Sequence, residues 1–246
     1  MASLRWELQL GVALTVTSVL AYLAHFLVFG DAHHIFIYLL GDIAFVPINV
    51  LLVTVILDRV LQQRERKARL EKLNIVIGAF FSEMGTSFLA YLSDADPRLG
   101  DIRKRLLVDN GWDDALFDAA DAAIRAHDYD IDMDRIDLAV VKRDLADARP
   151  FLVRLLENPA LLEHESFTTL LQAVAHVSEE LGSRPSLYEL PASDLLHLRG
   201  DMRRAYALLS SEWLSYMRHL KRYYPYLFSL AMRTNPFDQD SSAVVA

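Results

Sequence analysis

The feature that most constrains this chain is an apolar run from Ile35 to Leu57. The run is about 23 residues long, which is roughly 34 Å as a helix and enough to cross the ~30 Å hydrocarbon layer of a bilayer. No glycine or proline separates its end from the charged segment at residues 58–72. The sequence therefore predicts a transmembrane helix that continues into a charged helix outside the bilayer.

A second apolar run precedes it, at about residues 10–30. A cleaved signal peptide would have an apolar core of about 7–15 residues and then a small-residue cleavage site. This run is longer and ends in bulky residues, so we expect a retained helix. The link at residues 31–34 has no Lys or Arg, whereas the flank after Leu57 is strongly basic. The positive-inside rule then predicts a multi-pass protein of the cytoplasmic membrane with both termini in the cytoplasm.

The rest of the chain has the pattern of helices. Apolar residues recur at spacings of three and four from Leu70 to Tyr91, which is the period of an amphipathic helix. Further helices are predicted at about 101–108, 113–127, 136–157, 163–181, 193–222 and 224–232, and Asp113 is a predicted N-cap. Few glycines (9) and prolines (8) interrupt them.

The predicted fold class is therefore all-α, a two-helix transmembrane hairpin followed by a cytosolic helical bundle. The hairpin occupies residues 1–58, with spans at about 10–30 and 35–57. A basic juxtamembrane and amphipathic helix is expected at 59–93, the cytosolic bundle at 94–234 and a flexible tail at 235–246.

Polar residues inside the predicted spans are the first candidates for function. Asp42 and Asn49 are seven residues apart and project from nearly the same side of a helix, and Tyr38 lies one turn before Asp42. Pro47 removes a backbone hydrogen bond near the middle of the span. Helix rise places His25 at a similar depth to Asp42, where a structural pair between them would lock the two helices together. The pore or ion-binding candidates are Asp42, Asn49, Tyr38, His25 and Pro47.

An Asp followed shortly by a Pro, near the outer start of the second span of a hairpin, resembles the pore of the calcium uniporter family. The resemblance covers a short stretch around Asp42 and Pro47. That family has a Glu immediately before the Pro, and Val46 stands at that place here. The resemblance implies a cation pathway, and the missing Glu puts the uniporter's own cation site in doubt.

A basic cluster follows the second span. Its members are Arg59, Arg64, Arg66, Lys67, Arg69 and Lys72. Basic side chains next to a bilayer attract anionic lipid headgroups by about 1 kcal/mol each, so these residues are predicted headgroup contacts. The whole chain carries a net charge of -8, which argues against a nucleic-acid partner.

Carboxylates and histidines in the predicted bundle are weak metal candidates: Glu163, His164, His176 and Glu179. Di-metal sites on helical bundles use Glu-x-x-His from two helices, whereas this chain has His-x-x-Glu once, at His176 and Glu179. Solvated helix faces explain the cluster more simply, so no metal and no cofactor are predicted. No phosphate loop, G-x-S-x-G elbow or H-E-x-x-H motif is present, and the sequence predicts no enzyme.

Three hypotheses of function follow. Two helices cannot enclose a pore, so the first is a homo-oligomeric ion channel with Tyr38, Asp42 and Asn49 toward the axis and a cation as its partner. The second is a membrane-tethered helical scaffold or sensor that binds a cytosolic protein. A membrane-bound enzyme is the third, and only the residues between 163 and 180 favour it.

Overall fold

The computed structural model describes the backbone of residues 2–159, 161 and 164–244, and the side chains of 2–5, 34, 66–72 and 101 lie outside the described set. The predicted all-α class is confirmed, because 79% of the chain is helical and the described residues contain no strand. The chain divides into two compact units, at residues 1–66 and 67–246. The boundary between them falls inside one helix, α2 (Ala32–Phe80).

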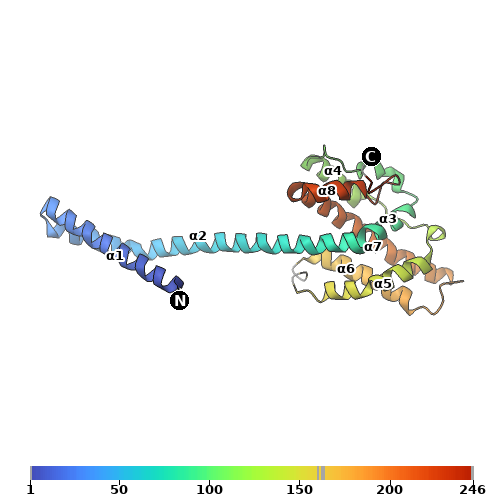
Figure 1. The fold of residues 1–246 in the computed structure, drawn as a ribbon, viewed down its shortest axis with the longest axis horizontal. Coiled ribbons are helices and arrows are strands. Elements are labelled where there is room, and N and C mark those ends of the chain that lie inside the picture. The colour runs from blue at the N-terminus through green and yellow to red at the C-terminus, as the bar shows by residue number, and fades with distance from the viewer. Residues whose placement is uncertain (1, 160, 162–163, 245–246) are drawn as a thin grey trace. The chain divides into compact units, whose positions relative to one another are not determined.

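The first unit is a helical hairpin made of α1 (Ala2–Phe29) and the beginning of α2 (Figure 1). Gly30 has a φ of +66°, a left-handed conformation that glycine adopts without steric cost and that reverses the chain. The Asp31 carboxylate accepts a hydrogen bond from the His33 backbone N–H at 2.9 Å, which satisfies a donor at the start of α2. The Tyr22 hydroxyl donates to Asp42 Oδ2 at 3.2 Å and joins the two helices.

Almost all the apolar side chains of the hairpin are exposed. Helices long and apolar enough to span a membrane occur at Trp6–Phe29 and Ile35–Glu65, with mean hydropathies of 2.0 and 2.2, and none of either apolar stretch is buried. A third such helix, at Leu73–Asp94, has a mean hydropathy of 1.5 and is 44% buried. The α-helix continues through Pro47. The hairpin therefore has no apolar core of its own among the described residues.

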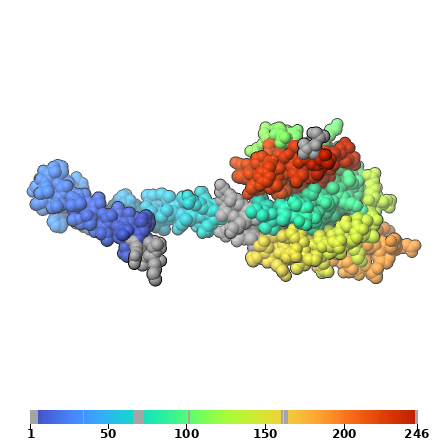
Figure 2. Space-filling view, viewed as in Figure 1, coloured from blue at the N-terminus to red at the C-terminus, as the bar shows by residue number. Residues whose placement is uncertain are grey.

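The second unit is a helical bundle around α7 (Ala192–Tyr223). Its other helices are α3 (Thr86–Asp94), α4 (Asp114–Ala126), α5 (Leu138–Leu156), α6 (Glu165–Ser183) and α8 (Pro225–Arg233). Helix α7 packs against α3, α4, α6 and α8, while α5 packs against α6. Figure 2 shows the segment after residue 72 running across one face of this unit, between α8 and the α5–α6 pair. Buried residues at helical spacing on α7, such as Leu198, Met202 and Leu209, form the centre of the core.

The N-termini of two helices are capped by aspartate side chains. The predicted cap is confirmed at Asp113, whose carboxylate accepts from the Leu116 backbone N–H at 2.9 Å. Asp137 caps α5 in the same way and accepts from Ala139 and Val140. These caps satisfy backbone donors that the first helical turn leaves unpaired.

Two predicted helices differ from the structure. The helix predicted from Leu70 to about residue 93 contains a π-helical turn at Phe81–Gly85, between α2 and α3, that the prediction did not include. At Gly85 an added Cβ would lie 2.6 Å from the Phe80 ring, so only glycine allows this close packing. The helix predicted at 101–108 is replaced by two 3-10 turns, at Leu99–Asp101 and Arg103–Arg105.

The chain after α8 also departs from the prediction of a loose tail from residue 235. Asn235 and Phe237 are buried. The Asn235 side chain donates to the Leu106 carbonyl at 2.8 Å, and Arg103 Nε donates to the Phe237 carbonyl at 2.8 Å. Residues 235–237 therefore belong to the core of the second unit.

Candidate functional site

The polar residues predicted within the spans all lie in the first unit. Asp42 accepts its hydrogen bond from Tyr22, a residue that the sequence analysis did not single out. The His25 ring is half-buried and packs 4.7 Å from the Phe29 ring. Tyr38, Pro47 and Asn49 are exposed on α2. The structure thus joins Asp42 to α1, and the predicted pore face remains a prediction.

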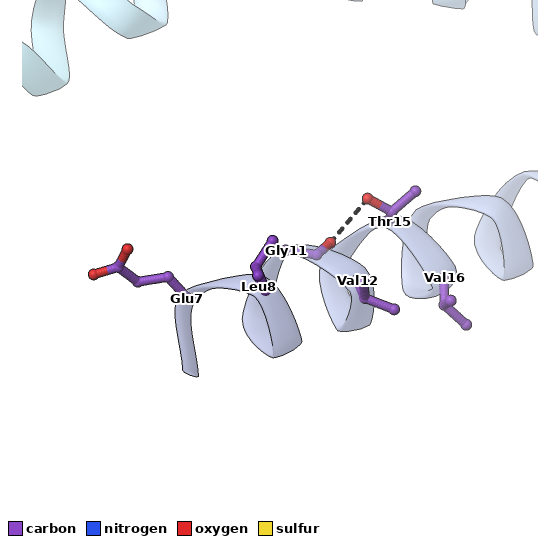
Figure 3. A pocket seen from close by; sticks show the side chains of 6 residues that line it. All are labelled: Glu7, Leu8, Gly11, Val12, Thr15 and Val16. Carbon is purple, nitrogen blue, oxygen red and sulfur yellow. Dashed lines mark hydrogen bonds between the residues drawn. The ribbon is translucent and has the colours of Figure 1, made fainter. Parts of the chain in front are cut away.

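A shallow hollow on α1 lies over Gly11 (Figure 3). Its lining residues are Glu7, Leu8, Gly11, Val12, Thr15 and Val16. The Thr15 hydroxyl donates to the Gly11 carbonyl at 2.9 Å, and no described atom lies within 4 Å of where a Gly11 Cβ would be. The hydroxyl is thus satisfied within the helix.

Four side chains of types that can ligate metals gather between α6 and α7 of the second unit. His176 and Glu180 lie four residues apart on α6, and His197 and Asp201 lie four residues apart on α7. Side chains at this spacing project from the same face of a helix, and the two helices pack face to face. One potential ligand atom from each residue lies within 4.8 Å of all the others. We call these four residues the His–carboxylate cluster.

Both imidazoles of the cluster point their Nε2 atoms at its carboxylates. His176 Nε2 lies 3.4 Å from Asp201 Oδ2 and 3.8 Å from Glu180 Oε1. His197 Nε2 lies 3.4 Å from Asp201 Oδ2 and 3.5 Å from Glu180 Oε2. These distances exceed the 2.9–3.0 Å typical of an N–H···O hydrogen bond.

Burial differs sharply within the cluster. The side chain of Asp201 is 6% exposed, whereas those of His176 and His197 are 43% and 53% exposed. Asp201 Oδ2 is buried and has no hydrogen-bond partner among the described residues. The cluster is therefore open to solvent on the histidine side and closed at Asp201.

Two arginines hold the carboxylates of the cluster. Arg184 Nη1 donates to Glu180 Oε2 at 2.8 Å, and the same guanidinium donates to Asp194 through Nε at 2.8 Å. The hydrogen bond from Arg184 lowers the pKa of Glu180 and also that of Asp194. Arg204 lies 3.4 Å from Asp201 Oδ1, the oxygen that does not face the histidines. Glu180 is therefore ionised near neutral pH and fixed in orientation.

The metal candidates from the sequence are only partly in this cluster. His176 belongs to it, but Glu179 is exposed and its neighbour Glu180 takes the position on the cluster face. His164 caps α6, since its side chain accepts from the Phe167 backbone N–H. Glu163 lies outside the described residues. A His-x-x-x-carboxylate spacing, repeated on α6 and α7, is the sequence signal that would have identified the full set.

A second polar group lies inside the core. His127 Nε2 and Asp96 Oδ2 are 2.8 Å apart, and their side chains are 4% and 0% exposed. The Tyr129 ring packs edge-on against His127 and against Tyr206. Burial raises the pKa of Tyr129 to about 12, so its phenol stays protonated. The group is closed to solvent, which suits a structural role.

Of the predicted headgroup contacts, Arg59 and Arg64 are exposed on α2. The side chains of Arg66, Lys67, Arg69 and Lys72 lie outside the described set.

These features define an all-helical protein of two parts, an N-terminal helical unit and a C-terminal helical domain. Two family models match the same two parts: "MJ1433, N-terminal helical domain" over residues 2–61 and "Uncharacterized protein MJ1433, C-terminal helical domain" over residues 69–233. Uncharacterized protein MJ1433 of Methanocaldococcus jannaschii is 46% identical over 237 residues, which cover 96% of this chain and 95% of the relative. The chain belongs to the MJ1433 family. No solved structure matches it.

Proposed function

We propose that this chain is a multi-pass membrane protein whose hairpin lies in the bilayer and tethers the C-terminal domain as a cytoplasmic sensor or scaffold. One observation carries the proposal: two helices of 24 and 31 residues bury none of their apolar stretches within the chain. Covering a Leu, Ile, Val or Phe side chain is favourable by about 1.5–3 kcal/mol. Leaving both helices in water would cost tens of kcal/mol, whereas lipid covers them at no such cost.

The third apolar helix, at Leu73–Asp94, belongs to the domain in this proposal. Its buried residues, including Leu73, Ile77, Phe80 and Phe88, pack in the core of the second unit. Their burial within protein removes the reason for placing them in lipid. The basic residues from Arg59 onward would then lie at the cytoplasmic headgroups, with the link before α2 outside.

Topology can be tested with single cysteines, because the natural chain contains none. Ala32→Cys reports on the link and Ser241→Cys on the C-terminal end, and both positions are exposed. We expect a membrane-impermeant maleimide to label Ala32→Cys in intact cells and to label Ser241→Cys only after permeabilisation. Both proteins should stay in the membrane pellet after alkaline carbonate extraction. Release by carbonate, or labelling in the reverse pattern, would contradict the proposal.

A homo-oligomeric ion channel is the second candidate, favoured by the exposed polar residues on α2. Asn49 and Tyr38 are exposed in the apolar span, on the same side as Asp42. We expect proteoliposomes to show a cation flux that Asn49→Leu and Asp42→Asn reduce at least tenfold. Ile48→Leu, about 100° round the helix, should leave the flux unchanged. If the purified protein is monomeric or gives no flux, the channel hypothesis is wrong; if the variants keep the full flux, Asp42 and Asn49 do not line the pore.

A further inference from the structure

The His–carboxylate cluster has the composition and spacing of a metal site. Two imidazole nitrogens from two helices face two carboxylates from the same helices, with neighbouring donor atoms 3.4–3.8 Å apart. We propose that His176, Glu180, His197 and Asp201 bind one divalent first-row transition metal ion between α6 and α7. The site lies wholly within the second unit, so the proposal does not depend on membrane insertion.

The spacing fits an ion at the centre better than direct pairing. Zinc lies 2.0–2.1 Å from histidine nitrogens and 2.0–2.2 Å from carboxylate oxygens, which puts neighbouring donors in a tetrahedral shell about 3.4 Å apart. Three of the four imidazole to carboxylate distances are 3.4–3.5 Å. A direct hydrogen bond would bring the same atoms to about 2.9 Å.

The buried oxygen of Asp201 is the second observation that points to a ligand. Asp201 Oδ2 is the carboxylate oxygen of the cluster nearest to both imidazoles, and it lies in the closed end of the cluster without a hydrogen bond from the described residues. A buried carboxylate oxygen without a hydrogen bond is costly, and the two imidazoles at 3.4 Å are too far away to supply a good one. A cation held by both histidines supplies the missing partner and offsets this cost.

Donor chemistry selects the class of ion. Imidazole nitrogen binds zinc and iron well, whereas magnesium and calcium require shells of oxygen. Two carboxylates also balance the charge of a divalent ion. Arg184 and Arg204 act as positioning residues. Arg204 lies against Asp201 Oδ1, the oxygen that does not face the histidines, and Arg184 donates to Glu180 Oε2, which leaves Glu180 Oε1 without a bond from this arginine.

Because the two histidines are exposed, a metal ion bound in this site could exchange with ions in solution. An ion can reach the cluster from solvent, and the side chains that hold it come from two different helices. Binding would therefore cross-link α6 to α7 and stabilise the bundle by an amount that rises with the logarithm of the free metal concentration once that concentration exceeds the Kd. The site suits reversible binding of a metal ion by the domain.

The test uses the full chain without an affinity tag, purified in detergent, stripped with a chelator and titrated with Zn²⁺. We expect one Zn²⁺ per chain, a higher melting temperature with Zn²⁺ and no competition from excess Mg²⁺. Co²⁺ in the same site should give the strong visible absorption of tetrahedral coordination. His197→Gln and Glu180→Gln should weaken Zn²⁺ binding at least 100-fold, since even residues that only orient ligands contribute 10–100-fold.

Matched controls separate this site from others. Glu179→Gln changes the adjacent, exposed carboxylate, and His33→Gln changes an exposed histidine of the first unit, so both should bind Zn²⁺ as the natural chain does. Circular dichroism without metal should be the same for all four variants, because His197 and Glu180 are not core residues. The proposal is wrong if the natural chain binds no Zn²⁺, or if Glu180→Gln and His197→Gln bind as tightly as the controls.

Discussion

Replacing His127 by leucine is expected to destabilise the C-terminal domain by about 3–5 kcal/mol. His127 and Asp96 form a pair 2.8 Å apart, and both side chains are almost completely buried. Leucine fills a similar volume but removes the imidazole that lies 2.8 Å from Asp96 Oδ2, while the backbone N–H of Arg98 still donates to Asp96 Oδ1 at 2.8 Å. The cost is therefore mainly that of a buried charge without its partner, and urea unfolding followed by tryptophan fluorescence would measure it.

A double-mutant cycle identifies the cause of that loss. Once Asp96→Asn has removed the charge, His127→Leu should cost at least 1 kcal/mol less than in the natural chain, because no carboxylate is left unpaired. Equal costs in the two backgrounds would mean that His127 stabilises the core by packing against Tyr129 alone.

The helices of this chain could be predicted because their signals are local. Spacings of three and four from Leu73 to Phe88 predicted a buried face, and those residues are buried. Asp113 was predictable as a cap from its place before an apolar pattern. The π-helical turn was not, because it depends on how Phe80 and Phe81 pack over Gly85 in the folded core.

The partner of Asp42 shows the limit of counting depth along a helix. Helix rise gave His25 and Asp42 similar depths, and the structure adds a donor to Asp42 that this estimate did not name, Tyr22, almost one turn further from the link. Rise alone fixes depth and leaves open the rotation of each helix about its axis. A neighbour across a hairpin can therefore be missed by one turn.

The metal candidates show that comparison with a known metal-binding motif can miss ligands that have a different spacing. The Glu-x-x-His motif of di-metal sites places its two ligands three residues apart. Comparison with that motif therefore paired His176 with Glu179 as metal candidates. Positions four apart also share a helix face, and that spacing joins His176 to Glu180 and His197 to Asp201. Only the packing of α6 on α7 brings the two pairs together, so the complete cluster depends on tertiary structure.

Replacing Phe237 by alanine is expected to destabilise the domain by about 3–5 kcal/mol, although this residue lies only seven positions from the end of the described chain. Its side chain is fully buried, and its ring packs edge-on at 5.2 Å from the Trp213 ring. Alanine would leave a cavity beside α7, the helix that organises the bundle, and local hydrogen bonds would limit its collapse. These bonds run from the Phe237 N–H to Asn235 Oδ1 at 3.0 Å and from Arg103 to the Phe237 carbonyl.

Val244→Ala is the matched control, because Val244 is 76% exposed in the same segment and should change stability by less than about 0.5 kcal/mol. Urea unfolding of the three full-length proteins in one detergent gives the comparison. A Phe237→Ala variant as stable as Val244→Ala would mean that the chain after α8 does not hold the core together. The expected difference follows mainly from burial: both changes remove apolar groups from the same short segment, but only Phe237→Ala removes atoms from the interior.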